Sequence, residues 1–212
     1  MIQIDDSGSG SLIGGTCIGL YNTETKQYYY EIIPIKYYNK NNFPRKKYLD
    51  YAIDIVKHGF QVLSVSKNDT IEVCRGYMFD KLRNWLNEKN YNWKSTQITG
   101  YLQDTIEKTF EEYAISLGFP KQYIKYTRYP FHFHRILRWV YADYHKRSKL
   151  CKVGWKSWEK YGKLPTQVTY ETMPDKCYSC LKCGKTLEPF TQVKVLRYVS
   201  NKPNTIYLHV NC

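Results

Sequence analysis

The N-terminal segment constrains the fold of this chain more than any other part of it. A short apolar strand with Ile2 and Ile4 ends in two adjacent carboxylates, Asp5 and Asp6, and a glycine-rich loop follows before a second apolar stretch at residues 16–21. A strand holds the side chains at its end in fixed positions, and carboxylate oxygens are the ligands that hard divalent cations prefer. The segment therefore predicts a sheet that presents an acidic, metal-binding edge.

The remaining pattern predicts an α/β fold in which helices cover a mixed sheet. Strands are expected from Ile2 onward and over residues 16–21, 28–37, 69–74 and 95–100. Helices are expected over residues 48–58, 78–86, 102–117 and 133–149, and Gly59 is a suitable stop for the first. Three consecutive strands at the N-terminus indicate an antiparallel meander.

Composition divides the chain into three parts. Residues 1–150 carry the alternating strands and helices, and they are expected to form the large domain. Residues 151–175 are rich in basic and aromatic side chains and are interpreted as a linker. Residues 176–212 carry paired metal-ligand residues and are expected to form a zinc finger.

The first motif resembles the opening of type 2 ribonucleases H, where a strand ends in Asp-Glu before a Gly-Arg-Gly loop, Pro-Leu and another glycine. The matching residues here are Asp5, Asp6, Gly8, Gly10, Leu12 and Gly14. Ser9 stands in place of the family's arginine and Ser11 in place of its proline. Because that arginine belongs to how the family reads a ribonucleotide in a duplex, the resemblance does not extend to the type 2 substrate.

The order of elements over residues 1–145 is also similar to the wider ribonuclease H-like superfamily, which includes RuvC-type junction resolvases. In those proteins a glutamate at the end of the fourth strand joins the aspartate of the first, and Glu72 matches that place. The resemblance implies a ribonuclease H-like mixed sheet and a metal-dependent nuclease that uses two Mg²⁺ or Mn²⁺ ions. The candidate catalytic residues are Asp5, Asp6, Glu72, Asp104 and His134, with Asp80, His132 and Asp143 as further candidates for completing the site.

Each of these residues also has a structural interpretation. Two aspartates before a glycine loop often form a turn in which their side chains accept hydrogen bonds from local amides. Glu72 can be a solvated strand residue, and His134 lies in an aromatic segment where histidines commonly pack. The sequence alone leaves both interpretations open.

The C-terminal segment has the spacing of a zinc site. Two cysteines and a histidine–cysteine pair are each separated by two residues, and 25 residues lie between the pairs. The expected ligands are Cys180, Cys183, His209 and Cys212. Four such ligands complete a tetrahedral site without an open position, so the zinc is expected to be structural. The segment resembles treble-clef and PARP-like zinc fingers. Cys177 is a competing ligand that could replace Cys180, because Cys177 and Cys180 also have ligand spacing, although Gly184 favours the later pair.

The chain is strongly basic, with a formal net charge of +13. Such a charge favours a polyanionic partner, and aromatic side chains interleaved with the basic ones suit base stacking. The expected nucleic-acid contacts are Arg135, Arg138, Lys146, Arg147, Lys149, Lys152 and Lys156. A solvated helix with an aromatic core face is the alternative interpretation of this stretch.

No apolar run approaches the roughly 20 residues that span a bilayer, and the acidic N-terminus does not have the pattern of a signal peptide. We therefore expect a cytoplasmic protein without a membrane partner, while the sequence does not indicate an oligomeric state. The preferred hypothesis is a nuclease that cleaves structured or duplex nucleic acid. The alternatives are a non-catalytic nucleic-acid-binding protein on the same scaffold and a zinc-finger protein–protein adaptor.

Overall fold

The central sheet of the molecule has the first strand of the chain in its middle. The computed structural model describes residues 1–125, 131–176 and 178–212. The sheet contains β1 (Ile2–Ser7), β2 (Thr16–Asn22), β3 (Tyr28–Ile33), β4 (Ile71–Cys74) and β5 (Trp93–Thr96), in the order β3-β2-β1-β4-β5. The β1–β2 and β2–β3 pairs are antiparallel, whereas the β1–β4 and β4–β5 pairs are parallel. The predicted mixed sheet and N-terminal meander are thus confirmed.

Two strand boundaries differ from the prediction. β3 ends at Ile33 rather than Tyr37, because Pro34 has no amide hydrogen to continue the ladder and a short 3₁₀ helix, η1 (Ile35–Tyr38), follows it. The last strand of the sheet covers residues 93–96 instead of 95–100, since Gly100, with a φ of +78°, already begins the next helix.

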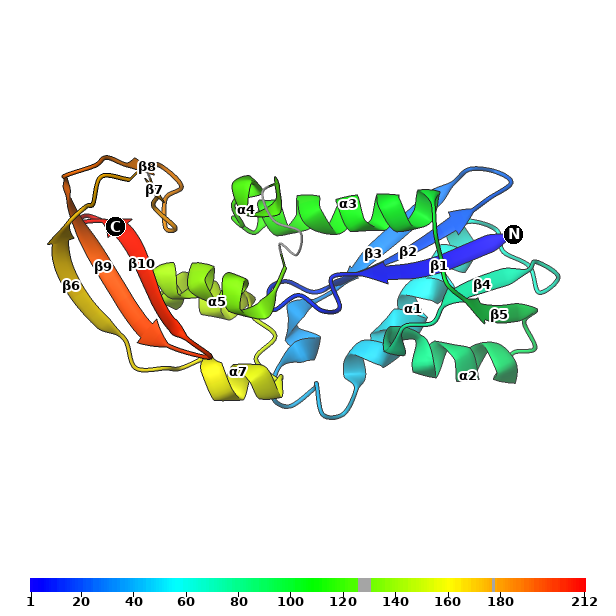
Figure 1. Ribbon diagram of the computed structural model, residues 1–212. Coiled ribbons are helices and arrows are strands. Elements are labelled where there is room, and N and C mark those ends of the chain that lie inside the picture. The colour runs from blue at the N-terminus through cyan, green and yellow to red at the C-terminus, as the bar shows by residue number, and fades with distance from the viewer. Residues whose placement is uncertain (126–130, 177) are drawn as a thin grey trace.

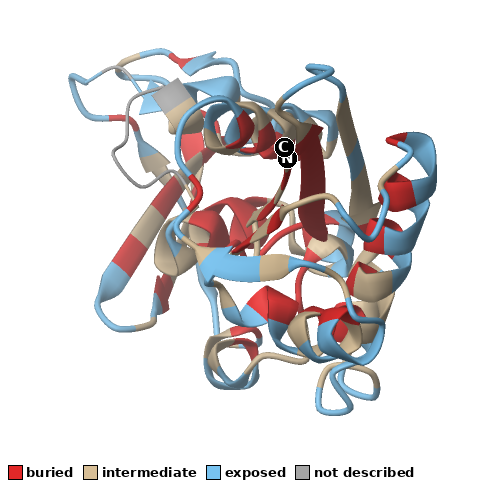
Figure 2. Cartoon of the chain, turned by 90° about the vertical axis from the view of Figure 1, so that its right-hand side faces the viewer, coloured by how far each residue is buried: buried red, intermediate tan, exposed pale blue. Residues whose placement is uncertain are grey.

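Helices cover both faces of this sheet (Figure 1). α1 (Lys47–Val62) and α2 (Asp80–Glu88), the latter preceded by the 3₁₀ helix η2 (Tyr77–Phe79), pack against each other on one face, and α3 (Tyr101–Ser116) crosses β1 and β2 on the other. Buried and exposed residues alternate along these helices, as amphipathic helices require (Figure 2). Among the described residues, no helix has both the length and the apolar character needed to cross a membrane.

Gly59 has a different role from the predicted helix stop. α1 continues through it to Val62. A Cβ atom at Gly59 would lie 2.7 Å from Cδ2 of Leu20 and 2.9 Å from Cδ1 of Tyr29. The glycine therefore allows the helix to approach the sheet closely.

The predicted long helix over residues 133–149 is interrupted. It consists of α5 (Phe133–Ala142), α6 (Tyr144–Arg147) and the 3₁₀ helix η3 (Ser148–Leu150), and a further short helix, α4 (Lys121–Lys125), precedes it. The break falls at Asp143, whose φ of −148° and ψ of 65° are incompatible with a helix. The break turns the chain back toward the central sheet.

The stretch predicted to be a linker is instead built into the fold. Cys151 forms a β-bridge with Ile13, the amide of Lys152 donates to the carbonyl of Leu12 at 2.8 Å, and a helix, α7 (Lys156–Tyr161), follows. The prediction that residues 151–175 form a linker is therefore wrong. Because these contacts join the chain to the glycine-rich loop, the C-terminal part is anchored directly to the central sheet.

The C-terminal part contains a second sheet that begins earlier than the predicted boundary at residue 176. This sheet consists of β6 (Gln167–Thr172), β9 (Gln192–Val199) and β10 (Pro203–His209) in the order β10-β9-β6, and a small hairpin is formed by β7 (Tyr178–Ser179) and β8 (Thr186–Leu187). α5 packs against β10, and one buried apolar cluster includes Leu12, Trp139 and Val195. The C-terminal sheet thus shares a hydrophobic core with the preceding helices.

Candidate functional sites

The four predicted zinc ligands converge. The ligand atoms of Cys180, Cys183, His209 and Cys212 (hereafter the Cys/His cluster) all lie within 4.8 Å of one another. The Sγ atom of Cys183 lies 3.3 Å from Nδ1 of His209. Among the described residues, no other group of three or more cysteine, histidine or acidic side chains meets this geometry. The predicted competitor, Cys177, lies outside the described residues.

Two tight turns build the Cys/His cluster. Cys180 and Cys183 lie in the turn between β7 and β8, where the amide of Gly184, with a φ of +79°, donates to the carbonyl of Cys180 at 2.8 Å. His209 is the last residue of β10, and the amide of Cys212 donates to its carbonyl at 3.0 Å. Each turn brings two ligands to the same side, so pairing the hairpin with the strand end assembles all four.

The surroundings of the cluster favour metal binding. Nε2 of His209 lies 3.0 Å from the carbonyl oxygen of Thr186, so this nitrogen can carry the proton and leave Nδ1 as the ligand. Burial by itself would raise the pKa of the Cys180 thiol. Hydrogen bonds from the backbone amides of Cys183, His209 and Lys182 and from the His209 side chain outweigh burial and lower this pKa to about 6. The four side chains could therefore hold a structural zinc ion in a tetrahedral site without an open position.

Asp5 lies at the end of β1 beneath α3. Its side chain is buried, with 6% of its area exposed, and it accepts a hydrogen bond from the Cys74 thiol. Burial raises the pKa of the Asp5 carboxyl; the charge of Glu107 acts in the same direction, while hydrogen bonds from Cys74 and the Asp6 amide oppose it. A cation beside Asp5 and Glu107 would relieve this repulsion.

Asp6 points toward a different set of groups. Its carboxylate accepts a hydrogen bond from Ser9 and lies within electrostatic range of Lys152. Burial raises the pKa of Asp6 to about 6, and the charge of Asp5 adds to this, although Ser9 and Lys152 oppose it. Successive residues of a strand face opposite sides of the sheet, so the two aspartates do not point into one site as a simple pair.

Glu72 lies on β4 next to β1, as predicted, but its carboxylate already has partners. Gln3 is opposite Glu72 in the parallel register, and its Nε2 donates to Oε2 at 3.0 Å. Lys94 on β5 forms an ion pair with Oε1, also at 3.0 Å. The hydrogen bond from Gln3 and, after it, the Lys94 ion pair lower the pKa of Glu72 despite its partial burial. Alternation along β4 puts Glu72 on the same face as Cys74, the neighbour of Asp5.

Asp104 and His134 do not complete this site in the structure. Asp104 is exposed in the first turn of α3. The ring of His134 packs at 5.0 Å from that of Tyr161, and burial, together with the charges of His132 and Lys202, lowers the pKa of its imidazole. Within the described residues, neither forms a metal-ligand group with the acids at the end of β1.

The other candidates have ordinary roles. Asp80 forms an ion pair with Arg83 at 2.9 Å, and Asp143 stands at the break between α5 and α6. His132 is the residue before α5 and is exposed. Glu107 is the acid that lies close to Asp5 instead. Its position three residues after Asp104 and four before Glu111 was a helical-spacing signal that could have identified it.

Lys152 is inside the molecule, so the prediction that it contacts nucleic acid is wrong. Its ammonium donates to the carbonyls of Gly8 at 2.6 Å and Ser9 at 3.3 Å, and to the Thr16 hydroxyl at 3.4 Å. Its side chain has no exposed area. Burial lowers the pKa of Lys152 to about 7, against the opposing effect of Asp6. This lysine fixes the glycine-rich loop of residues 8–15 beside Asp5 and Asp6, hereafter the acidic strand end.

Arg147 is likewise buried and cannot serve as a phosphate contact on the surface. Its guanidinium donates to the carbonyls of Trp139 and Leu181 at 2.7 Å each and to that of Lys182 at 2.8 Å. It also lies 4.1 Å from the centre of the Trp139 ring. The predicted role is corrected: Arg147 joins α5 and α6 to the turn that carries the first zinc ligands.

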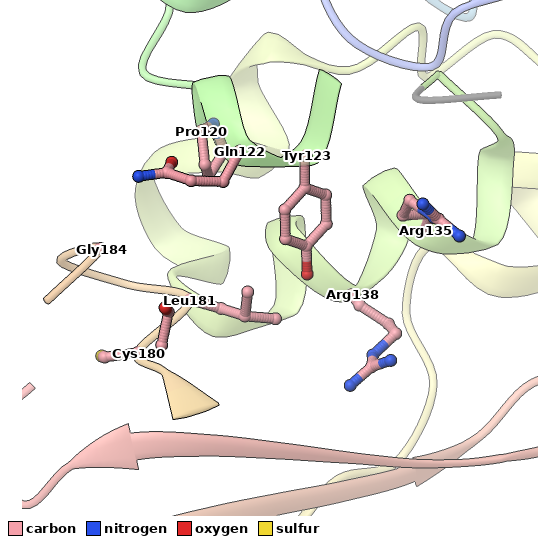
Figure 3. Close-up of a pocket in the computed structure, with 9 residues that line it drawn as sticks. Pro120, Gln122, Tyr123, Arg135, Arg138, Cys180, Leu181 and Gly184 are labelled. Carbon is pink, nitrogen blue, oxygen red and sulfur yellow. The ribbon is translucent and has the colours of Figure 1, made fainter. Parts of the chain in front are cut away.

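The remaining predicted nucleic-acid contacts lie where a ligand can reach them. Lys146, Lys149 and Lys156 are exposed, and Arg135 and Arg138 are partly exposed. The two arginines line a pocket between α4, α5 and the β7–β8 turn (Figure 3).

No protein-family model matches the chain, and no curated protein sequence matches it.

Proposed function

We propose that the chain is a metal-dependent nuclease with a ribonuclease H-like fold that acts on structured or duplex nucleic acid. The observation that carries the proposal is the sheet order β3-β2-β1-β4-β5, with Asp5 at the end of the central β1 and Glu72 on the adjacent parallel β4. This order and these two acid positions agree with the ribonuclease H-like resemblance of the sequence. Burial of Asp5 and its repulsion by Glu107 add a physical reason for a cation at this place.

The residues that would hold the ions are Asp5, Glu72 and Glu107 on the side of the sheet that α3 covers, whereas Asp6 faces Ser9 and Lys152 on the other side. Carboxylates are suitable ligands for Mg²⁺ or Mn²⁺. When bound, a pair of such ions activates a water molecule and stabilises the leaving oxygen of a phosphodiester. The protein's own contribution is positioning: Lys152 fixes the loop after Asp6, and the β1–β4 pairing fixes the separation of Asp5 and Glu72.

Glu72 has to exchange partners before it can bind a cation. Its two oxygens are held by Gln3 and Lys94, each at 3.0 Å. Lys94 is mostly exposed, with 61% of its side-chain area accessible, so its ammonium can move away and toward a phosphate. Substrate and metal would then replace the ion pair together, and the catalytic arrangement would form only on the nucleic acid.

The basic C-terminal half would bind the phosphates of the substrate. The net charge of +13 favours a polyanion. Exposed lysines on α6, η3 and α7 offer phosphate contacts, and the Cys/His cluster holds the β7–β8 turn against Arg147. We expect zinc to act there as a structural ion, separate from the Mg²⁺ or Mn²⁺ of the acidic strand end.

The test is a cleavage screen with Mg²⁺ or Mn²⁺ over single-stranded, duplex, hybrid and branched DNA and RNA. We expect cleavage by the zinc-loaded protein and a loss of more than about 100-fold in Asp5→Asn and Glu72→Gln, since even outer-shell partners of metal ligands account for about 10–100-fold. Asp80→Asn, which removes an exposed acid in an ion pair with Arg83, is the matched control and should remain active. The proposal would be contradicted if neither the wild type nor Asp80→Asn cleaved any substrate. It would also be contradicted if Asp5→Asn and Glu72→Gln both cleaved normally.

A non-catalytic nucleic-acid-binding protein on the same scaffold is the second candidate. One observation favours it: among the described residues the acids of β1, β4 and α3 do not form a group of three with ligand atoms within 4.8 Å. The same screen separates the two functions, because the wild type of a binding protein would show salt-sensitive affinity for nucleic acid but would cleave no substrate.

A further inference from the structure

A pocket of about 340 Å³ opens between α4, α5 and the β7–β8 turn, apart from the acidic strand end. Its described lining residues are Pro120, Gln122, Tyr123, Arg135, Arg138, Ser179, Cys180, Leu181 and Gly184. Figure 3 shows the Tyr123 hydroxyl pointing into the space between Leu181 and Arg138, with Arg135 on the same side. The volume is at the small end of ligand pockets, which span about 300–1,000 Å³, so the pocket suits a single small unit and not a duplex.

The chemistry of the lining suits one nucleotide. Tyr123 and Leu181 give aromatic and apolar surface for a base, and the side-chain amide of Gln122 offers both a donor and an acceptor. Two arginines supply the planar donors that bind phosphate oxygens, and no acidic side chain is among the described lining residues. Arg138 is oriented by its hydrogen bond to the carbonyl of Thr205 at 2.8 Å.

We propose that this pocket, the α4–α5 pocket, takes a single unpaired nucleotide of a structured nucleic acid. Its base would lie against Tyr123 and its phosphate would be bound by Arg135 and Arg138. Unpaired bases are the ones that can leave the stack and enter a pocket of this kind. The proposal rests on the proposed function and narrows its substrate to duplexes that carry an unpaired nucleotide.

α3 separates this pocket from the acidic strand end. Glu107, whose charge acts on Asp5, and α4 are joined by the second half of α3, and the nine residue steps from Glu107 to Ser116 rise about 14 Å in a helix. Successive nucleotides of one strand in a duplex are about 3.4 Å apart. Because the lining of the pocket lies beyond the end of α3, a strand with one nucleotide in the pocket would place the phosphodiester at Asp5 at least about four nucleotides away.

The first experiment measures binding without cleavage, in the absence of Mg²⁺ and Mn²⁺. A 20-base-pair duplex with one unpaired nucleotide is compared with the fully paired duplex, as DNA and as RNA. We expect the zinc-loaded protein to prefer the unpaired nucleotide about tenfold, because stacking of one base on an aromatic side chain contributes roughly 5- to 150-fold to affinity. Arg135→Gln and Tyr123→Leu should each bring the ratio near unity. Lys146→Gln, an exposed lysine outside the pocket, is the matched control and should weaken both duplexes equally.

A direct contact measurement covers the case in which a variant fails to fold. 5-Iodouracil at the unpaired position should cross-link on irradiation to Tyr123 in the wild-type protein, identified by peptide mass spectrometry. Binding of both duplexes with equal affinity, or cross-linking that excludes α4 and α5, would overturn the α4–α5 pocket while leaving the proposed nuclease intact. Absence of any salt-sensitive binding would contradict both proposals.

Cleavage mapping tests the spacing. With Mn²⁺ present, moving the unpaired nucleotide by one position along the duplex should move the cut by one position, so that the separation stays constant at a value of at least about four nucleotides. Cuts at fixed positions that ignore the unpaired nucleotide would overturn the proposal.

Discussion

The Cys/His cluster and the acidic strand end contain metal-type ligands in opposite states of assembly. In the cluster all four ligand atoms lie within 4.8 Å; hydrogen bonds lower the pKa of the Cys180 thiol, whereas burial and the neighbouring cysteines raise the pKa of Cys212 to about 11. At the strand end Asp5, Asp6 and Glu72 have separate partners, and burial raises the pKa of both aspartates. A structural ion needs ligands that are ready when the chain folds, whereas a catalytic ion can use ligands that assemble with the substrate. This difference is the one that the proposed structural and catalytic roles would require.

The largest effect is expected from breaking the preassembled region. Cys183→Ser removes one thiolate, and because structural zinc contributes on the order of 10 kcal/mol to small zinc-dependent folds, the β7–β8 hairpin should lose its structure. Metal analysis should show loss of zinc, and limited proteolysis should cut first within residues 178–190.

Cys74→Ser, a cysteine outside the cluster, should retain zinc and resist proteolysis. Zinc retained by Cys183→Ser would refute the assigned ligand set. Zinc retained by a Cys180→Ser variant would instead point to Cys177 as the ligand.

The next largest effect is expected from replacing Arg147, which connects the Cys/His cluster to the helices. Arg147→Gln should lower the free energy of unfolding by about 3 kcal/mol, because three carbonyls lose a charged donor and a buried acceptor without a partner costs about 1–3 kcal/mol. Denaturant unfolding of the zinc-loaded protein measures it. Lys146→Gln, the exposed neighbour, should change the value by less than about 0.5 kcal/mol. Equal effects of the two substitutions would contradict the structural role of Arg147.

A smaller effect tests whether the acidic strand end is strained without a cation. The pKa of Asp6 is raised to about 6 in the folded protein, from 3.8. The folded state therefore holds this proton more tightly, and wild-type stability should fall relative to Asp6→Asn as the pH rises from about 4 to about 6. Since one pKa unit corresponds to about 1.4 kcal/mol, we expect a relative change on the order of 2 kcal/mol. Thermal unfolding of both proteins over this range, without Mg²⁺ or Mn²⁺, measures it, and parallel curves would contradict the prediction.

The smallest effect concerns the surface. Replacing Lys146, Lys149 and Lys156 with glutamine should reduce the slope of log K against log salt by up to about 3, because each duplex phosphate contact contributes about −0.9. Binding titrations at several salt concentrations give the slope. An unchanged slope would place the phosphate contacts elsewhere on the molecule.

The comparison also explains what could be predicted from the sequence. The Cys/His cluster was predictable because its ligands come in two pairs, each within one turn, so local spacing carries most of the geometry. The mixed sheet was predictable because its strands have apolar patterns and its order follows short connections. The side chain that contacts Asp5 was harder to predict from the sequence. Cys74 takes this place, and Glu72 pairs with Gln3 instead.

Other features depend on contacts between distant segments. Nothing local to Lys152 distinguishes it from the exposed lysines around it, yet it contacts a loop 144 residues away. Gly59 resembles a helix stop until the close approach of Leu20 is known. In the same way, the break at Asp143 lies within an otherwise continuous helical pattern, and the residues after it are held by Leu12 and Ile13.

The contact between Lys152 and the glycine-rich loop has a consequence for biosynthesis. While the chain is being made, β1, the loop and Asp6 leave the ribosome long before Lys152 does. Until then the carbonyls of Gly8 and Ser9 lack the ammonium that fixes them in the finished protein. The acidic motif is thus synthesised well before Lys152, but the loop beside it reaches its final geometry only after Lys152 has joined it. A nascent chain that ends before Lys152 has the acidic motif without the positioned loop beside it.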